Sequence, residues 1–531
     1  MLPADRRPGL ETTLASMLQT SYSTYAGQAA LVHGEVVQSY AELGEQAHRL
    51  ARGLHTLGVC PQDRIVILSA NCPEFIIATH AIFVGGYVRV ALGARLHPME
   101  IIDIVQDCRP RAIFLGSDWV ENLSRIRDQL TSVEQFIVLD GSAEGMLSFS
   151  QLVEAGDRLQ PTTPVAADDL CALIYTSGTT GRPKGAMLTH ANWVAMVRNS
   201  MVELPPVETD DVVLHVAPLS HLSGYVEPTY SARGACHVVS TSFQPPRVLE
   251  DIRSLNVTIL PLVPTMLNML VSEADSSGNV KAPTLRVILY GGSAIAPSRL
   301  AHAVSVFGDV FVQFYGLSEV PMPLSCLSRG DHRFDPAGTL PARLASAGRV
   351  NPFVELRICG PSGEMLPAGS LGEITVRSDT IMAGYWHRPD LTCEMVNVDN
   401  WAATGDLGRL DSDGYLYIVD RKSDMIVTGG YNVYPTEVEN IISTLNEVDE
   451  VAVVGVPDMR WGEAIKAIVV LRKGSRLTEE DIISACARRL AGYKKPRSVE
   501  FVSELPKTSS GKIKRRQLRD GYWADSDRSV G

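Results

Sequence analysis

The chain lacks any paired-cysteine pattern. Its 531 residues contain nine cysteines, an odd number, and no two of them are spaced as C-x-x-C. Neither a disulfide framework nor a zinc site is therefore indicated, and reduced thiols in a cytosolic protein are the expectation.

Hydrophobic runs long enough to cross a membrane are also missing. The most apolar window, residues 75–93, contains His80 and Arg89 and is interrupted by Gly85 and Gly86. This pattern predicts a buried helix followed by a core strand. Residues 1–11 are polar and include prolines, which is not typical of a signal peptide. We therefore expect a cytoplasmic protein with no membrane span.

An excess of positive charge is absent too. The chain has 48 Lys and Arg against 60 Asp and Glu, a net charge of -12, which argues against bulk nucleic-acid binding. The basic run at residues 512–516 is too short to require a nucleic acid. The sequence also contains no internal repeat and no low-complexity tract.

The most informative segment present is YTSGTTGRPKGAMLTH, residues 175–190. Glycines let the backbone approach a polyphosphate, and successive N–H groups form an anion-binding concavity. Thr179, Thr180 and Lys184 add hydroxyl donors and positive charge. The spacing is not that of a Walker A loop, because Gly185 and an apolar run follow the lysine instead of a Ser or Thr that opens a helix. The segment predicts a phosphate-binding loop between two strands.

Around this loop, short apolar runs alternate with helical patterns over the first 420 residues. The runs at residues 64–69, 111–115, 135–139, 212–216, 258–261 and 287–289 are expected strands. Such alternation is typical of largely parallel sheets covered by helices, an α/β fold. After residue 420 the pattern changes to a compact α+β unit. Its expected elements are helices at 435–445 and 478–490 and strands at 451–456 and 464–471.

Seven further motifs follow the phosphate-loop segment in a fixed order. They are PLSHLSG (218–224), YGGSAIAP (290–297), QFYGLSE (313–319), GEITVRSDTIMAGYW (372–386), TGDLG (404–408), DRKSDMIVTGGYNVYPTEVE (420–439) and PKTSSGKIKRR (506–516). With them, residues 35–519 closely resemble the adenylate-forming superfamily of the acyl- and aryl-CoA synthetase type. The resemblance implies an N-terminal AMP-binding domain (1–420), a hinge (421–423) and a mobile C-terminal domain (424–531) that carries a catalytic lysine.

The resemblance also implies roles for individual residues in binding ATP and Mg²⁺. Lys512 bridges the carboxylate and the α-phosphate, Ser318 contacts the α-phosphate, and Glu319 holds Mg²⁺ together with Thr180. The expected nucleotide-binding residues are Thr176, Ser177, Gly178, Thr179, Thr180, Gly181 and Lys184 on the phosphates, Tyr315 at the adenine, and Asp406 and Arg421 on the ribose. Gly316 is also expected to contact the nucleotide and to form part of the pocket wall.

A second set of residues is implied for transfer of the acyl group to CoA. Gly429 and Gly430 would line the path of the pantetheine arm after the C-terminal domain has rotated about the hinge. At the hinge, Ser423 departs from the Asp or Lys that is usual in the family. His221 would orient the substrate carboxylate at the mouth of the acyl pocket. The expected pocket residues are His221, Tyr225, Gly291, Gly292 and Val320.

The substrate is the least constrained part of this interpretation. No Asp occurs between Ser220 and Arg233, where family members that activate amino acids hold the α-ammonium, so an aryl or fatty acid is expected. The thiol acceptor could be CoA or a carrier protein, and another nucleophile such as an amine could also capture the adenylate. An inactive nucleotide-binding scaffold is disfavoured because the chain retains all four of Glu319, Asp406, Arg421 and Lys512. Arg89 and Ala91 depart from the family's usual aromatic residue and proline, and the sequence offers no account of them.

Overall fold

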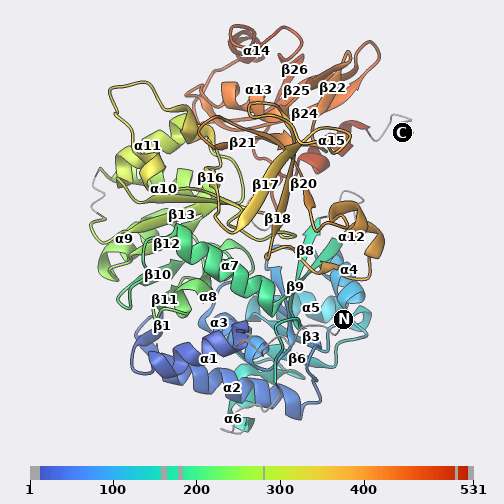
Figure 1. The fold of residues 1–531 in the computed structure, drawn as a ribbon. Coiled ribbons are helices and arrows are strands. Elements are labelled where there is room, and N and C mark those ends of the chain that lie inside the picture. The colour runs from blue at the N-terminus through green and yellow to red at the C-terminus, as the bar shows by residue number, and fades with distance from the viewer. Residues whose placement is uncertain (1–11, 157–163, 178–182, 279–281, 509–511, 524–531) are drawn as a thin grey trace, which may run out of the picture.

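The structure, a computed structural model, describes residues 12–156, 164–177, 183–278, 282–508 and 512–523. Two large, mostly parallel sheets form most of the N-terminal part (Figure 1). In spatial order, the nine-stranded sheet contains β16 (Arg349–Val350), β15 (Ser325–Leu327), β14 (Phe311–Tyr315), β13 (Val287–Gly291), β12 (Ile259–Leu262), β10 (Val212–His215), β11 (Cys236–Val239), β1 (Ala29–His33) and β2 (Val36–Ser39). The eight-stranded sheet contains β19 (Gly384–Tyr385), β9 (Pro183–Thr189), β8 (Leu170–Ser177), β4 (Val88–Gly93), β3 (Arg64–Ser69), β5 (Ala112–Leu115), β6 (Gln135–Val138) and β7 (Leu147–Ser148).

Helices cover both sheets on both faces, as the alternating pattern predicts. α9, α10 and α11 pack on one face of the nine-stranded sheet and α8 on the other. α4 and α5 cover one face of the eight-stranded sheet, and α1, α2, α3 and α7 cover the other. The helices are α1 (Leu14–Thr24), α2 (Tyr40–Thr56), α3 (Pro73–Val84), α4 (Pro98–Cys108), α5 (Val120–Ile126), α6 (Phe149–Ala155), α7 (His190–Glu203), α8 (Leu222–Ser231), α9 (Pro245–Ser254), α10 (Pro264–Ser277), α11 (Pro297–Phe307) and α12 (Pro389–Met395).

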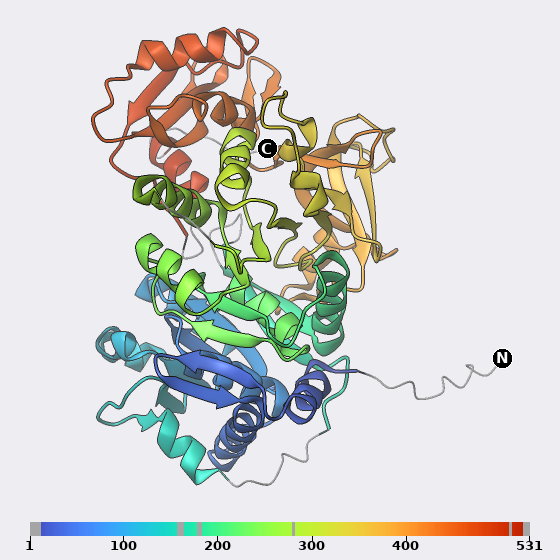
Figure 2. The same ribbon diagram turned by 90° about the vertical axis from the view of Figure 1, so that its left-hand side faces the viewer.

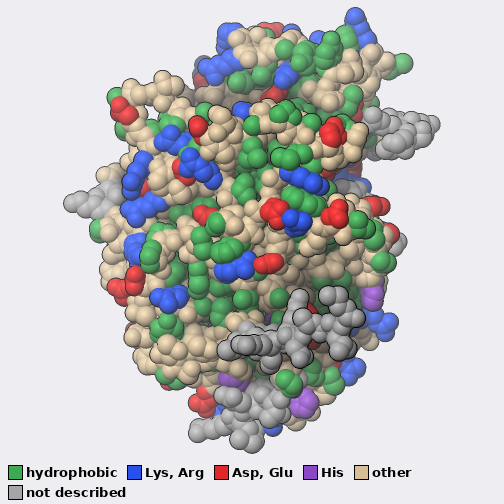
Figure 3. All heavy atoms as spheres, viewed as in Figure 1, with side chains coloured by type: hydrophobic (Ala, Val, Ile, Leu, Met, Phe, Trp, Pro, Cys, Tyr) green, Lys and Arg blue, Asp and Glu red, His purple; other side chains and the backbone are tan. Residues whose placement is uncertain are grey.

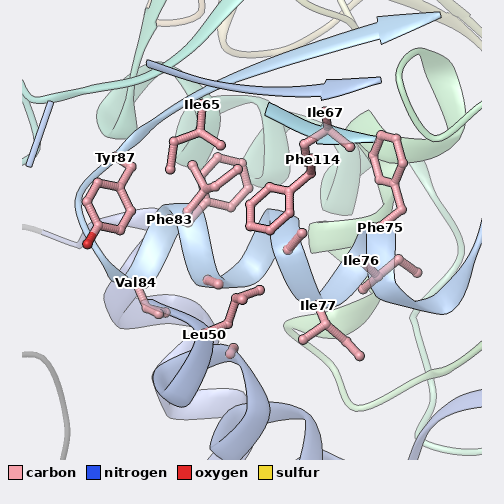
Figure 4. Packing of buried hydrophobic residues seen from close by; sticks show 14 of the residues in the cluster. Leu50, Ile65, Ile67, Phe75, Ile76, Ile77, Phe83, Val84, Tyr87 and Phe114 are labelled. Atoms are coloured by element: carbon pink, nitrogen blue, oxygen red, sulfur yellow. The ribbon is translucent and has the colours of Figure 1, made fainter. Parts of the chain in front are cut away.

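The apolar window at residues 75–93 lies in the core of this arrangement. It forms the end of α3 and then β4, as predicted, and every residue of α3 from Phe75 to Val84 is buried. Figure 4 shows Phe75 and Phe83 packed against Phe114 and the isoleucines of β3. No helix in the described part of the chain combines the length and apolar character that crossing a bilayer requires.

Two smaller sheets complete the molecule. A four-stranded antiparallel sheet contains β17 (Val354–Cys359), β18 (Gly372–Ser378), β20 (Ala402–Leu410) and β21 (Leu416–Arg421). The C-terminal part combines β22 (Ile426–Thr428), β23 (Tyr431–Val433), β24 (Val448–Asp458), β25 (Gly462–Leu471) and β26 (Ser498–Phe501) with α13 (Pro435–Ile442), α14 (Glu479–Ala487) and α15 (Arg515–Trp523). This is the predicted α+β unit, and β21 ends at Arg421, where the sequence predicts the hinge.

The C-terminal unit, drawn in orange and red, lies at one end of the molecule, over α11 (Figures 1 and 2). Arg299 of α11 donates to the backbone carbonyl of Asp449 at 2.8 Å. Acidic and basic side chains are interspersed on the face shown in Figure 3, as the mixed charge of the sequence suggests.

Candidate active site

The predicted nucleotide-binding segments converge where the strands of the nine-stranded sheet end. β13 and β14 are parallel neighbours, so Gly291 and Gly292 lie beside Tyr315 and Gly316. A Cβ atom on Gly291 would overlap the carbonyl of Phe314, and one on Gly316 would overlap the backbone of Met322. These two glycines are therefore needed for close approach of the backbone at the ends of the strands.

Asp406 is a buried carboxylate beside this edge that contacts the buried Tyr315 and the half-exposed Arg421. Its Oδ2 accepts a hydrogen bond from the Tyr315 hydroxyl at 2.6 Å, and its Oδ1 pairs with Arg421 Nε at 2.7 Å. β20 and β21 place Asp406 and Arg421 directly opposite each other. Burial raises the pKa of Asp406, although Arg421 and Tyr315 oppose that shift. The structure therefore brings together the three residues predicted for adenosine.

Glu319 joins the phosphate-loop strands to a second motif. Its Oε1 accepts from the Tyr385 hydroxyl at 2.8 Å and lies 3.5 Å from the Thr176 hydroxyl of β8. Lys184 of β9 lies over the Tyr385 ring, with Nζ 5.6 Å from its centroid. Because β19 pairs with β9, Tyr385 is fixed beside the loop strands. Glu319, Thr176 and Lys184 thus share one site, as predicted.

The remaining predicted phosphate contacts lie partly outside the described residues. Gly178, Thr179, Thr180 and Gly181 lie outside the described residues, and Ser177 is described as the last residue of β8. Ser318 is half-buried in the turn after β14.

Lys512, from the far end of the chain, lies at this same site. A Cβ atom on Gly292 would lie 3.7 Å from Lys512 Cε. The lysine keeps an exposed surface, yet desolvation by the surrounding protein and the charge of Arg421 lower its pKa, while Asp406 and Glu319 raise it. Lys512 therefore lies close enough to both predicted functional carboxylates for their charges to raise its pKa.

His221 precedes α8 on the side of the site away from the nucleotide residues. Its Nδ1 lies 2.8 Å from the Ser220 hydroxyl. Burial, helped by the charges of Lys512 and Arg89, lowers the pKa of His221 to about 4, so the ring is neutral near pH 7. One turn into the helix, Tyr225 packs edge-on against Trp193 at 5.9 Å, and Val320 is fully buried. These contacts fit an aromatic wall for an acyl group.

Gly429 and Gly430 lie elsewhere, in the turn between β22 and β23. The N–H of Gly429 donates to the Trp461 carbonyl at 2.8 Å, and both glycines are exposed on the C-terminal unit. Their positive φ angles, +57° and +82°, suit glycine in such a turn. Any role in thiol entry would require this unit to move, so that role stays a prediction.

Sequence reasoning missed Tyr385 as a site residue. Its signal was present in the GYW end of the motif at residues 372–386, but only the pairing of β19 with β9 reveals that the hydroxyl reaches Glu319. Arg89 was noticed as a departure from the family pattern and left unexplained. It is buried beneath the PLSHLSG segment, with Nη2 2.9 Å from the Leu219 carbonyl.

Comparisons with known proteins agree with this arrangement. A family model described as AMP-binding enzyme matches residues 18–386, and one described as AMP-binding enzyme C-terminal domain matches residues 437–512. The chain is 37% identical over 497 residues to a feruloyl-CoA synthase from an Amycolatopsis species, covering 92% of this chain and 95% of that protein. It is 33% identical to the fatty acid–[acyl-carrier-protein] ligase ScoC of Streptomyces coeruleorubidus, covering 94% and 95%.

Among solved structures, the anthranilate CoA ligase AuaEII in complex with anthranoyl-AMP superposes with a TM-score of 0.88 at 26% identity, covering 98% of this chain and 99% of that one. Both family models match in the expected order, and the first spans more than half of the chain. This chain belongs to the AMP-binding enzyme family.

Proposed function

We propose that this protein is an AMP-forming acid–thiol ligase that activates an aryl or fatty carboxylic acid as its acyl adenylate and then transfers the acyl group to CoA. The observation that carries this proposal is the position of Lys512. Its Cε lies beside Gly292 and the charges of Glu319 and Asp406 raise its pKa, although it comes from the C-terminal unit. The domain boundaries at 420 and 423 belong to the same proposal.

In the first half-reaction, a carboxylate oxygen of the acid attacks the α-phosphorus of ATP and pyrophosphate leaves. Two anions must approach each other, so the protein has to position them and offset their charge. Lys512 lies where its ammonium can contact both groups. Asp406 and Arg421 hold the ribose, Tyr315 lies against the adenine, and the residues of the loop at 176–184 bind the leaving phosphates.

Glu319 and the neighbouring hydroxyls suit Mg²⁺. This ion prefers oxygen ligands and is usually bound through one or two carboxylates together with substrate phosphates. The Glu319 carboxylate and the Thr176 hydroxyl offer such oxygens beside the phosphate-loop strands, and Thr180 is proposed as a further ligand. When bound, the ion would neutralise charge on the phosphates, and Tyr385 would hold the orientation of Glu319.

In the second half-reaction, the CoA thiol loses its proton, its sulfur bonds to the acyl carbon, and AMP leaves. Lys512 would have to withdraw first, because the thiol needs access to the carbonyl that it covers. Rotation about residues 421–423 would remove it and bring Gly429 and Gly430 towards the site. The reaction consumes ATP and a free thiol, which fits a cytoplasmic location.

CoA is favoured as the acceptor by the surface beside the Gly429–Gly430 turn. The rings of Tyr431 and Tyr493 stack at 4.5 Å, and both side chains are exposed. Trp461 is flanked by Arg460 and Arg497, whose guanidinium carbons lie 4.8 and 5.6 Å from its ring centroid. Exposed aromatic faces with adjacent cations suit a nucleotide base and its phosphates. A carrier protein remains the second candidate, since ScoC is named for that activity.

The acyl pocket supports an uncharged aryl or fatty group. The one acidic residue on α8, Glu227, is buried and its Oε1 lies 3.0 Å from His80 Nε2. It is therefore already paired and unsuited to holding a substrate ammonium. The aromatic contact between Trp193 and Tyr225 provides the apolar wall.

Mass spectrometry of reactions with ATP, Mg²⁺ and a panel of aryl, fatty and short-chain acids tests the proposal. An acyl-AMP mass without CoA that converts to acyl-CoA when CoA is added is the expected result. Acyl-AMP that accumulates and ignores CoA would redirect the second step to a carrier protein or an amine. Absence of any acyl-AMP across the panel would contradict the proposed function.

A further inference from the structure

Arg89 is a buried cation in β4 without an acidic partner in direct contact. Only 2% of its surface is exposed, and no ion pair within the described residues includes it. Its Cζ lies 5.7 Å from the Phe75 ring and 5.8 Å from the Trp193 ring. Burial lowers its pKa to about 10, which leaves it charged near pH 7. Burying an unpaired charge is costly, so this position calls for an explanation.

The polar contacts of Arg89 lead to the segment that carries His221. Its Nη2 donates to the Leu219 carbonyl at 2.9 Å, whereas its contact with the Thr79 hydroxyl is longer, at 3.4 Å. The N–H of the same Leu219 donates to Asn71 Oδ1 at 2.8 Å. Asn71 Nδ2 in turn donates to the Ala217 carbonyl at 2.9 Å. Arg89 of β4 and Asn71, which follows β3, therefore bind the carbonyl and the N–H of Leu219. Leu219 lies two positions before His221.

The first turn of α8 rests on the same contact. A Cβ atom on Gly224 would overlap the Leu219 carbonyl and lie 3.3 Å from Arg89 Nη2. A cavity of about 10 Å³ beside Gly224 is lined by Arg89 and Glu227 among others. This volume is no larger than one water molecule, so the packing around Arg89 leaves no room for a substrate group. Arg89 is thus built into the wall behind His221 and too deep to touch a substrate.

We infer that Arg89 is a positioning residue that fixes the Leu219 peptide and thereby orients His221 toward the acyl carboxylate. The inference rests on the proposed function, because the role of His221 does. A guanidinium suits this task since its planar donors can hold a carbonyl while its faces contact aromatic rings. A phenylalanine at this position would pack in the same layer but has no donor for the Leu219 carbonyl.

A double-mutant cycle between Arg89 and His221 tests the inference. The variants are Arg89→Met, His221→Ala and their combination, with Thr79→Val as a control that removes only the longer contact. Acyl-AMP formation is measured under single-turnover conditions, with whichever of benzoate, cinnamate and octanoate the wild type activates best. The apparent affinities for the acid and for ATP are determined separately.

If Arg89 acts through His221, Arg89→Met weakens acid activation on the order of tenfold or more and leaves the apparent affinity for ATP unchanged. The same substitution has little further effect in the His221→Ala background, Arg89→Lys restores part of the loss, and Thr79→Val behaves as wild type. The inference would be overturned if Arg89→Met lowered acid activation equally with and without His221. It would also be overturned if the substitution lowered the apparent affinity for ATP as much as it lowered acid activation.

Thermal unfolding of every variant separates positioning from folding. If Arg89→Met does not fold, Arg89→Lys and Arg89→Gln decide by the same comparison in both backgrounds. A wild type that forms acyl-AMP from none of the three acids, nor from the wider panel, contradicts the proposed function and the inference with it. If the wild type forms acyl-AMP but the effects of Arg89→Met and His221→Ala are additive, the inference alone is contradicted.

Discussion

Lys512 is attached to the C-terminal unit, but charges of the N-terminal part determine the pKa of its ammonium. Its backbone is fixed locally, because its N–H donates to the Thr508 hydroxyl at 3.0 Å and its carbonyl accepts from the Thr508 N–H at 2.7 Å. The pKa of its ammonium, in contrast, is shifted by the charges of Asp406 and Arg421, which lie more than ninety positions away in the chain. The two hydrogen bonds with Thr508 thus position the backbone of the lysine, and the N-terminal part determines the electrostatic surroundings of its ammonium.

Replacing Lys512 should separate the two half-reactions. We expect Lys512→Ala to lower acyl-AMP formation by about a hundredfold or more, because a charge aimed at the transition state is lost. Thioester formation from supplied acyl-AMP should stay near wild type. Both rates can be followed by mass spectrometry, with Lys514→Ala as a matched control two residues on. Equal loss of both steps would contradict the assigned role.

The neutral state of His221 can be tested directly. Its pKa of about 4 lies below the usual value of a histidine, and the positive charges of Lys512 and Arg89 add to the effect of burial. Among the described residues, the charges that shift it are those of Lys512 and Arg89. Lys512→Ala removes one cation and should therefore raise the pKa of His221. An NMR titration of the ring signal, assigned by its loss in His221→Ala, measures both values, and a wild-type pKa near 6.5 would contradict this description.

At the scale of elements, the two-residue strand β19 determines how Glu319 is presented. It pairs with β9 and carries Tyr385, whose hydroxyl reaches the carboxylate. Tyr385→Phe removes that hydrogen bond and little volume, so we expect a higher Mg²⁺ concentration for half-maximal acyl-AMP formation, by about threefold to tenfold. The folded state should be kept.

Tyr417→Phe on β21 is a matched control, since that ring packs with Arg409 away from Glu319. Direct titration with Mn²⁺ by electron paramagnetic resonance, in the presence of ATP, gives a readout independent of turnover. Unchanged metal affinity in Tyr385→Phe would show that the hydroxyl does not support Glu319.

α8 is held by a buried chain of hydrogen bonds. Ser223 contacts His215 Nδ1 at 2.7 Å, His215 Nε2 lies 2.9 Å from His237 Nδ1, and Ser231 contacts His237 Nε2 at 3.0 Å. Burial lowers the pKa of His215 to about 3 and that of His237 to about 4, with Glu227 opposing the shift in both. Neutral imidazoles therefore hold α8, the helix that carries Tyr225 of the proposed acyl wall.

These histidines should make the fold sensitive to acid. Because their pKa values are lower in the folded state, the unfolded chain takes up protons first, and stability falls as pH drops from about 6.5 towards 4. We expect the Tm to decline over that range and His237→Gln to reduce the slope. His302→Gln, at an exposed site, should leave it unchanged. A Tm that is flat between pH 4 and 6.5 would contradict the neutral state.

The element scale also shows what the sequence could predict. The hydrophobic pattern located α3, β3 and α14 within a few residues, although α13 ends at Ile442 instead of residue 445, where the chain turns before β24. The motifs located Asp406, Glu319 and Lys512. Contacts between distant segments were not accessible, because no local pattern reports that Tyr385 reaches Glu319 or that Arg89 holds Leu219.

At the scale of the whole molecule, a few contacts hold the C-terminal unit where Lys512 enters the site. Arg299 of α11 donates to the carbonyls of Asp449 and Val448 at 2.8 and 3.3 Å. Near the hinge, Asp420 Oδ2 accepts from the Thr436 N–H at 2.9 Å, and Arg515 lies 4.0 Å from Asp420 Oδ1. Among the described residues, polar contacts of this kind suit a unit that docks and releases, as the proposed function requires.

Arg299 is the contact best suited to test this alternation. Arg299→Ala removes both hydrogen bonds across the interface and should favour undocking by about 1–2 kcal/mol. Acyl-AMP formation, which needs Lys512 in place, should then slow by roughly fivefold to thirtyfold, while thioester formation from supplied acyl-AMP is kept or accelerated. The matched control is Arg333→Ala, because Arg333 pairs with Asp309 within the N-terminal part. Equal slowing of both steps would mean that the contact supports folding and not the docked state. Slower acyl-AMP formation together with unchanged or faster thioester formation would show that docking of the C-terminal unit separates the two half-reactions.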